Sequence, residues 1–275
     1  MKRRTTWIII LLVAVATSYV VAQRSRFRSR DEVDEQTYAR SGLTMWKNPP
    51  AFKHDTFTFA RVIYSGWGRG GGWATDYPDS DINFSFRLQQ LTSLKVNPIP
   101  VKLELTDPRL FDYPWIYMIE PGGLYFSEDE VKALRKYLLN GGFMMVDDFW
   151  GGDEYDNFHS QIKRVFPDRQ VVDLTIEHPI FHCVYDLKKL PQVPSIGHGA
   201  NGTTFEWRPG PDDGSQVHYR AIFDDKGRMM VIICHNTDLG DGWEREGENE
   251  YYFKEFSEKQ AYPMGINIVF YAMTH

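Results

Sequence analysis

The sequence predicts one α/β domain with a largely parallel central sheet and a hairpin towards its C-terminal end. Strand-like and helix-like segments alternate along most of the chain, which favours an α/β sandwich. Two segments, Trp115–Glu120 and Phe143–Val146, are almost continuously apolar, as is typical of parallel strands buried on both faces. Near the end, Tyr219–Phe223 and Met229–His235 flank the turn Asp224–Gly227 and predict the hairpin.

The first half of the domain begins with a predicted strand at Phe57–Ser65, followed by a glycine-rich loop. A helix is predicted at Asp81–Leu94, where apolar residues recur at helical spacing. Asp79 or Asp81 is expected to cap this helix and to favour its positive end. A short alternating strand follows at Val101–Leu105.

The next helix has the clearest boundaries. Ser127 and Glu130 form a capping-box pattern, and Gly141 stands where a left-handed C-terminal cap is expected. The face of this helix that we expect to be buried consists of Val131, Leu134, Tyr137 and Leu138. Further helices are predicted at Phe158–Phe166 and at Pro263–Met273.

The N-terminal segment predicts export from the cytoplasm. Residues 1–22 join a positive start to the apolar run Trp7–Ala22, a pattern that indicates a signal peptide or an uncleaved membrane anchor. Residues 23–55 then form a polar, arginine-rich tether and lead-in, and residues 56–275 form the domain. We therefore expect a periplasmic or inner-membrane-anchored protein that associates with the membrane through residues 1–30.

The composition argues against nucleic acid as a partner. The chain has 31 basic and 37 acidic residues, and the basic excess of the leader makes the remaining body more acidic still. Two cysteines, Cys183 and Cys234, could form a disulfide in an exported protein or could equally be two small buried residues.

Gly66, Gly68 and Gly71 match the spacing of a dinucleotide-binding loop. Such a loop requires a helix that begins inside the glycine run, so that its N-terminus faces the pyrophosphate. Here the helix begins later, and the intervening loop contains aspartates that would repel phosphate. We predict that no nucleotide binds there.

A calcium loop is also excluded. Asp79, Asp81 and Asn83 begin like an EF-hand, but Phe84 replaces the required glycine and Gln90 the bidentate glutamate. The sequence therefore predicts no metal site and no cofactor.

We expect the functional site at the carboxyl ends of the parallel strands, where ligands bind in open α/β sheets. The glycine loop and the loop after Phe143–Val146 both lie at this edge. The predicted ligand-binding residues are Trp67, Trp73, Asp76, Tyr77, Asp81, Asp148 and Trp150.

Asp147 and Asp148 leave a predicted strand together and are the strongest catalytic candidates. One of them could hold a cation or act as an acid or base. The alternative is that one faces solvent and the other caps a turn, because neighbouring strand residues point to opposite faces. His178, in the segment EHPIF, is the candidate partner, although a purely structural histidine fits the sequence at least as well.

Six segments resemble, in this order, an uncharacterised bacterial family of domains of unknown function: TDYPDSDINF, LTSLKVNP, LFDYPWIYMIEPGG, GGFMMVDDFWGG, VFPDRQVVDLTIEHPIF and GINIVFYAM. Members of that family are sometimes fused behind aerotolerance-regulator N-terminal segments. The family is similar to the flavodoxin-like fold of class I glutamine amidotransferases. The resemblance implies that Asp148 stands where those enzymes carry a cysteine nucleophile, which argues against glutaminase activity here.

Two functions remain open on the sequence alone. The first is a non-catalytic ligand-binding or assembly module of the cell envelope, with an envelope ligand or protein as its partner. The second is an envelope hydrolase, directed at carbohydrate, that uses Asp147 or Asp148 with His178. Convergence of these side chains with Asp76 or Asp81 would favour the enzyme.

Overall fold

The computed structural model describes residues 33–52, 55–67 and 72–275. The predicted leader and most of the arginine-rich tether lie outside these residues, as do Gly68 and Gly71 of the glycine run. The chain forms two compact units that divide between Met45 and Trp46. In the first unit, helix α2 (Glu35–Arg40) is capped by Asp34, whose side chain accepts a hydrogen bond from the backbone N–H of Thr37 at 2.9 Å.

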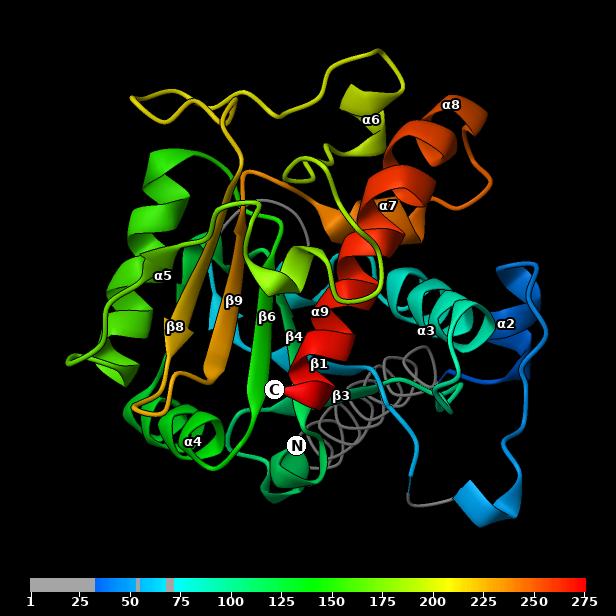
Figure 1. Cartoon of the computed structure of the whole chain (residues 1–275), viewed down its shortest axis with the longest axis horizontal. Helices are drawn as coiled ribbons and strands as arrows, with labels where there is room; N and C mark the ends of the chain where they lie inside the picture. Colours follow the sequence, from blue (N-terminus) through cyan, green and yellow to red (C-terminus); the bar gives the residue numbers. More distant parts are fainter. Residues whose placement is uncertain (1–32, 53–54, 68–71) are drawn as a thin grey trace, which may run out of the picture. The chain divides into compact units, whose positions relative to one another are not determined.

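The second unit contains a central sheet of seven strands in the order β3-β1-β4-β6-β9-β8-β7 (Figure 1). Five strands are parallel: β1 (Ala60–Ile63), β3 (Val101–Glu104), β4 (Trp115–Ile119), β6 (Phe143–Asp147) and β9 (Met229–His235). Strand β8 (His218–Phe223) runs antiparallel to both of its neighbours, β9 and β7 (Val172–Asp173). The predicted α/β class with a mostly parallel sheet is therefore confirmed.

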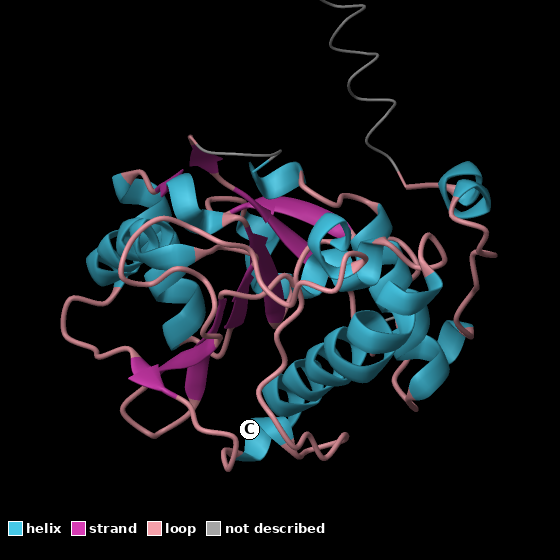
Figure 2. Cartoon of the chain, turned by 90° about the horizontal axis from the view of Figure 1, so that it is seen from above, coloured by secondary structure: helices cyan, strands magenta, loops and turns pink. Residues whose placement is uncertain are grey.

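Helices cover both faces of this sheet (Figures 1 and 2). One face packs against α3 (Asp79–Leu91), α7 (Leu239–Glu244) and α9 (Tyr262–Thr274). The other packs against α4 (Glu128–Leu139) and α5 (Gly151–Val165). Every residue of β4, β6 and β9 is buried, which explains why these strands are apolar without alternation.

The shorter elements connect these layers. A small antiparallel pair joins β2 (Ser65–Gly66) to β5 (Leu124–Tyr125). The remaining helices are α6 (Ile196–Gly199), α8 (Glu250–Tyr252), the π-helix η6 (Phe253–Ala261) and the 3-10 turns η1 (Pro50–Phe52), η2 (Gly72–Ala74), η3 (Pro108–Asp112), η4 (Pro121–Gly123) and η5 (Pro179–Phe181).

The predicted capping of α4 is confirmed. Ser127 accepts from the N–H of Glu130, and the Glu130 carboxylate accepts from the N–H of Ser127 at 2.8 Å. Gly141 has a φ of 104°, the left-handed conformation expected of a C-terminal cap. Arg228, in the hairpin turn between β8 and β9, donates to the carbonyls of Leu138 and Gly142 and so satisfies acceptors at this helix end.

Two predicted helix starts are wrong. Helix α3 begins at Asp79, and neither Asp79 nor Asp81 caps it, because no side chain caps its N-terminus. Helix α5 begins at Gly151, seven residues before the predicted start at Phe158. Its first turns read GGDEYDN, so they lack the apolar periodicity that marks an amphipathic helix.

Asp81 also differs from its predicted role in ligand binding. Its carboxylate is fully buried and forms an ion pair with the fully buried Arg61 of β1, whose Nε lies 3.1 Å from both oxygens. Arg61 donates further hydrogen bonds to Ser80 Oγ at 2.8 Å and to the carbonyls of Trp73 and Thr75 at 3.1 and 2.8 Å. Asp81 therefore joins α3 to the sheet.

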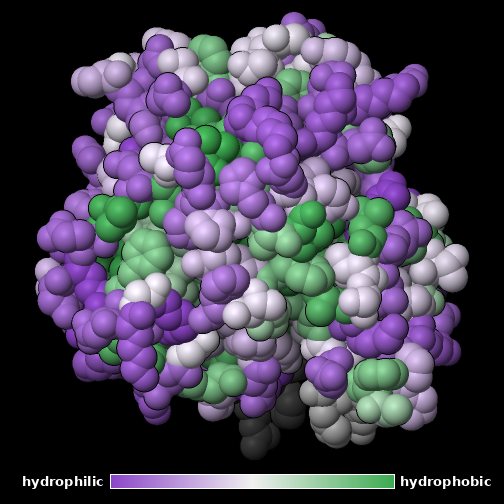
Figure 3. All heavy atoms as spheres, in the orientation of Figure 1, coloured by the Kyte–Doolittle hydropathy of each residue, from purple (hydrophilic) through white to green (hydrophobic). Residues whose placement is uncertain are grey.

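Hydrophilic residues cover most of the face in Figure 3, with apolar residues in scattered groups between them. Among the residues that the structure describes, none of the helices is both long enough and apolar enough to cross a membrane. Cys183 and Cys234 are both free, so the structure contains no disulfide between them.

Candidate functional site

The loops that follow β1, β4, β6 and β9 meet at one edge of the sheet. Strand β1 leads to α3 on one face, whereas its neighbour β4 leads to α4 on the other. The connections therefore separate between β1 and β4, which creates the crevice where ligands bind in open parallel sheets.

A cavity of about 490 Å³ opens at this edge, and we call it the acid cleft. Seven acidic residues line it: Asp76, Glu120, Asp148, Glu154, Glu206, Asp238 and Asp241. Among the residues that the structure describes, two basic residues, Arg208 and Arg245, line it as well. Its aromatic lining comes from Trp67, which is 74% exposed, and Trp150, which is 2% exposed.

The backbone around the acid cleft is strained. Among the described residues, four that are not glycine have a positive φ: Asp76 (60°), Glu120 (47°), Asp148 (55°) and Asn236 (60°). Three of the four line the cleft. Such conformations cost of order 1 kcal/mol or more and cluster at functional sites. The strained positions are therefore carboxyl-bearing residues: Glu120 directly after β4, Asp148 directly after β6, and Asp76 in the loop before α3.

Glu120, directly after β4, is positioned from several sides. Its N–H donates to the carbonyl of Asp147 at 3.1 Å, and its carbonyl accepts from the hydroxyl of Tyr64 at 2.6 Å. Its carboxylate Oε2 accepts from the N–H of Gly72 at 2.8 Å. The turn η2 is thereby attached to the cleft, and the Glu120 side chain is held in place before any ligand arrives.

Asp148, directly after β6, shares the cleft with other acids. Its Oδ1 accepts from the indole N–H of Trp150 at 3.1 Å, and its backbone N–H donates to the carbonyl of Thr237 at 3.1 Å. Burial, followed by the negative charges of Glu120 and Asp76, raises the pKa of Asp148 well above the usual aspartate value. Asp148 therefore keeps its proton to a higher pH than an exposed aspartate does.

Asp147, its neighbour, is fully buried and does not line the cleft. Its Oδ2 accepts hydrogen bonds from the Tyr117 hydroxyl and from the N–H of Gly240, both at 3.0 Å, whereas its Oδ1 has no hydrogen-bond partner. Burial raises the pKa of Asp147 to about 7, although the Tyr117 hydrogen bond opposes the shift. The two aspartates do face different surroundings, as strand geometry requires.

At the α7 end of the cleft, two of the lining acids, Asp76 and Asp241, form a group with Glu244. Oxygen atoms of Asp76, Asp241 and Glu244 all lie within 4.8 Å of one another. Arg245 Nε lies 3.2 Å from Oδ1 of Asp241 and 2.5 Å from Oε2 of Glu244, so one guanidinium partly neutralises the group. Oδ2 of Asp76 is buried without a hydrogen-bond partner. Burial raises the pKa of Glu244 to about 7, and burial and Glu244 raise that of Asp76.

The structure places four of the predicted ligand-binding residues at the cleft: Trp67, Asp76, Asp148 and Trp150. Trp73 and Tyr77 do not line it. Their rings lie instead beneath the ammonium group of Lys102, at 5.6 and 5.1 Å. Asp81 is absent from the lining because it is paired with Arg61.

His178 does not line the cleft either. It precedes η5, where its Nδ1 accepts from the N–H of Ile180 at 3.2 Å. Its ring lies 5.6 Å from that of Tyr271 in α9. Trp243 of α7 does not line the cleft either: it is fully buried, with its ring in contact with those of Phe84 and Tyr117. The hydrolase arrangement built on His178 is therefore not present.

Several cleft residues were missed from the sequence, although two carried a usable signal. Glu120 follows β4, and Asp238 follows β9 by three residues, so both occupy the same edge as Asp148. Glu206 and Arg208 come from a long loop, and Arg245 follows α7, where nothing in the local sequence indicates the sheet edge.

The structure therefore shows an α/β domain with an acid-lined cavity at the carboxyl edge of a mostly parallel sheet. Residues 58–273 match the family model described as Domain of unknown function (DUF4159), and the chain belongs to this family. A comparison with curated proteins finds no match.

Proposed function

We propose that the protein binds a small polar ligand in the acid cleft, and that this ligand is rich in hydroxyl groups and carries a positive charge, as an amino sugar does. The observation that carries the proposal is the excess of acid in the described lining of one cavity, where seven acidic side chains converge with two arginines. Carboxylates accept hydrogen bonds from hydroxyl and ammonium groups, and bonds of this charged kind are the stronger ones.

The aromatic residues support the same class of ligand. Trp67 offers an exposed indole at the rim of the cleft, where the apolar face of a sugar ring can stack. Trp150 is buried and hydrogen-bonded to Asp148, so it supports the acid and contributes little free surface. A largely preformed pocket with a few convergent polar groups is the usual form of a small-molecule site.

The fold that we propose around this cleft is flavodoxin-like. The five parallel strands follow the order second, first, third, fourth, fifth along the sheet, which is the flavodoxin-like order. Asp148 directly follows β6, where the resemblance to class I glutamine amidotransferases implies a cysteine nucleophile. This supports a binding descendant of that fold.

We also propose that the protein works outside the cytoplasm, in the periplasm or anchored to the inner membrane. This rests on the leader pattern of residues 1–22 alone. Cell fractionation, followed by protease treatment of intact spheroplasts, tests it: the domain should be degraded from outside. A domain that stays protected until the cells are lysed would contradict the proposal.

Calorimetric titration tests the binding proposal. The panel comprises amino sugars, neutral sugars, uronic acids and polyamines, and we expect amino sugars to bind most tightly and uronic acids not at all. Added salt should weaken binding, because the attraction is largely electrostatic. The variant Glu120→Gln should bind more weakly, whereas the exposed control Glu128→Gln, on α4, should bind like the native protein. Equal binding of amino sugars and uronic acids would rule the proposal out.

A glycoside hydrolase is the second candidate, and one observation favours it. The pKa of Asp148 is raised, whereas hydrogen bonds from Ser195 and Arg208 outweigh burial and lower that of Glu206. Two carboxyl groups of one cleft with opposite shifts can serve as general acid and as base or nucleophile. Release of nitrophenol from aryl glycosides, lost in Asp148→Asn, would establish the enzyme; tight binding without turnover would leave the binding function.

A further inference from the structure

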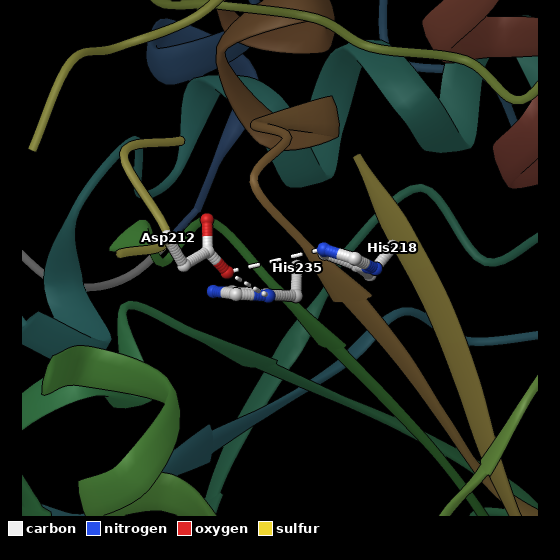
Figure 4. A group of neighbouring side chains, drawn as sticks. All are labelled: Asp212, His218 and His235. Carbon is white, nitrogen blue, oxygen red and sulfur yellow. Dashed lines mark ion pairs between the residues drawn. The ribbon is translucent and has the colours of Figure 1, made fainter. Parts of the chain in front are cut away.

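A second group of chemically reactive side chains lies on the hairpin, outside the acid cleft. His218 of β8 and His235 of β9 are direct partners in the antiparallel register. Side chains of such cross-strand partners stand on the same face of the sheet, close together. The two rings are nearly parallel, with centroids 5.7 Å apart and an angle of 17° (Figure 4).

Asp212 completes the group from the loop before β8. Its Oδ2 lies 3.9 Å from Nε2 of His218 and 3.9 Å from Nδ1 of His235, and the carboxylate points towards both rings (Figure 4). The three ligand atoms all lie within 4.8 Å of one another. Ligands about 2.1 Å from a tetrahedral zinc ion are about 3.4 Å apart. A closing movement of about half an ångström would bring the Asp212 oxygen to that spacing.

Hydrogen bonds from outside the group fix the orientation of His235 and Asp212. Nε2 of His235 lies 3.0 Å from the carbonyl of Gly151, and Oδ1 of Asp212 accepts from Asn236 Nδ2 at 2.9 Å and from the N–H of Gly214 at 3.2 Å. Such contacts fix the tautomer and direction of ligating side chains. The hydrogen on Nε2 leaves Nδ1 of His235 as an acceptor, which lies 3.9 Å from Asp212 Oδ2 and accepts a hydrogen bond from Arg220 at 3.1 Å.

We propose that His218, His235 and Asp212 bind a divalent transition-metal ion, best Zn²⁺. Two imidazoles and one carboxylate suit Zn²⁺ better than Mg²⁺ or Ca²⁺, which prefer oxygen ligands alone. His218 and Asp212 are 28% and 26% exposed, so the ion can enter from solvent and keep a water ligand. The site does not rest on the function proposed for the acid cleft.

Arg220 competes with the ion. Its Nη1 lies 3.1 Å from Nδ1 of His235, where the metal must bind. The guanidinium also pairs with Asp173 through Nε at 2.9 Å and lies 4.3 Å from the ring centre of Tyr155. Asp173 and Tyr155 can retain the guanidinium when the Nη1 contact is lost. Removal of the Arg220 charge should therefore tighten metal binding.

The carboxylate group of Asp76, Asp241 and Glu244 is the weaker candidate for this ion. It offers no imidazole, and Arg245 forms ion pairs with two of its three acids. A zinc ion there would have to break charged pairs rather than one hydrogen bond to a neutral ring.

Metal titration of the full chain tests the site. After removal of metal by a chelator, Co²⁺ is added and followed by its visible absorption, and Zn²⁺ affinity is measured by competition with a chromogenic chelator. We expect one ion per chain. The variants His218→Ala and Asp212→Asn should each weaken Zn²⁺ binding at least tenfold. His182→Ala, an exposed histidine outside the group, should leave it unchanged.

Two further results bear on the proposal. Arg220→Met should tighten Zn²⁺ binding several-fold, and Co²⁺ bands should shift in Asp212→Asn because one ligand changes. His218 and Asp212 are chosen for substitution because they are partly exposed, whereas His235 is fully buried. Circular dichroism checks that each variant is folded. Absence of stoichiometric binding in the native chain, or binding that folded His218→Ala and Asp212→Asn both retain, would overturn the site.

Discussion

The Arg61–Asp81 pair and the acid cleft remove carboxylates from water in opposite ways. Asp81 is fully buried, but a guanidinium satisfies both of its oxygens. Asp148 and Asp76 share a cavity with other acids, and their pKa values are raised by burial and by neighbouring negative charge. The Arg61–Asp81 pair connects α3 to the sheet, whereas the grouped acids of the cleft lower the free energy of unfolding. A carboxylate without compensation is therefore the better guide to the functional site.

Removal of one partner from the Arg61–Asp81 pair should have the largest effect. Arg61→Met leaves the Asp81 charge buried without a partner, which should lower the free energy of unfolding by about 3–5 kcal/mol. Urea denaturation monitored by fluorescence measures this. Arg109→Met is the matched control, because Arg109 is 65% exposed and its pair with Asp107 should be worth less than about 1 kcal/mol.

The double variant Arg61→Met with Asp81→Leu sharpens the comparison. It removes both charges, so much of the lost stability should return. A loss in Arg61→Met no larger than that in Arg109→Met would mean that Asp81 is not held as an ionised, buried partner, and the contrast with the cleft would fail.

The pH dependence of stability gives the next largest effect. The pKa of Asp147 is about 7 in the folded protein, against about 3.9 in the unfolded chain, so the folded state binds its proton more tightly. The protonated Asp147 side chain therefore contributes to the free energy of unfolding in full below about pH 4, and this contribution is lost as the pH rises to about 7. The loss is at most about 4 kcal/mol.

Asp147→Asn isolates that contribution, because asparagine cannot ionise. Urea denaturation between pH 4 and 8 should show a smaller decline for the variant than for the native protein. Parallel curves would show that Asp147 has the same pKa in both states.

The sequence could predict what depends on neighbours along the chain. The capping box of Ser127 and Glu130 and the hairpin that ends at His235 involve only nearby residues, and both were found. Asp148 was found because the end of a buried parallel strand defines the ligand-binding edge. Asp81 was misassigned because its partner, Arg61, is twenty residues earlier and its burial is a property of the packed sheet.

The remaining cleft residues depend on tertiary structure. Glu206 and Arg245 reach the cavity from a loop and from the end of α7, and only the arrangement of β9 beside β6 brings them near Asp148. The pairing of His218 with His235 follows from the hairpin register, but the approach of Asp212 does not. Local sequence patterns therefore located the edge of the sheet and part of the lining of the acid cleft, but they did not show how many acidic and basic side chains meet there.

Asp148→Asn should stabilise the protein modestly while impairing its function. At pH 7 the native side chain must take up a proton or bear a charge in a half-buried site among other acids, and asparagine avoids both, so we expect a gain of about 1 kcal/mol. Asparagine also tolerates the φ of 55° at this position. Amino-sugar binding should fall at least tenfold. Thermal unfolding and calorimetry on the same sample measure both, and a less stable variant with unchanged binding would make Asp148 a structural residue.

The smallest effect on stability should come from Trp67. Its side chain is 74% exposed, so Trp67→Ala should change the free energy of unfolding by no more than about 0.5 kcal/mol. Its indole is nevertheless the exposed aromatic surface of the cleft, and loss of a stacking contact worth about 0.5–1.5 kcal/mol should weaken ligand binding about two- to tenfold. Trp207→Ala is the control, because Trp207 is 64% exposed but does not line the cleft. If both variants bind the ligand like the native protein, the carboxylates alone recognise it, and an amino compound without a stacking ring face should bind as tightly as an amino sugar.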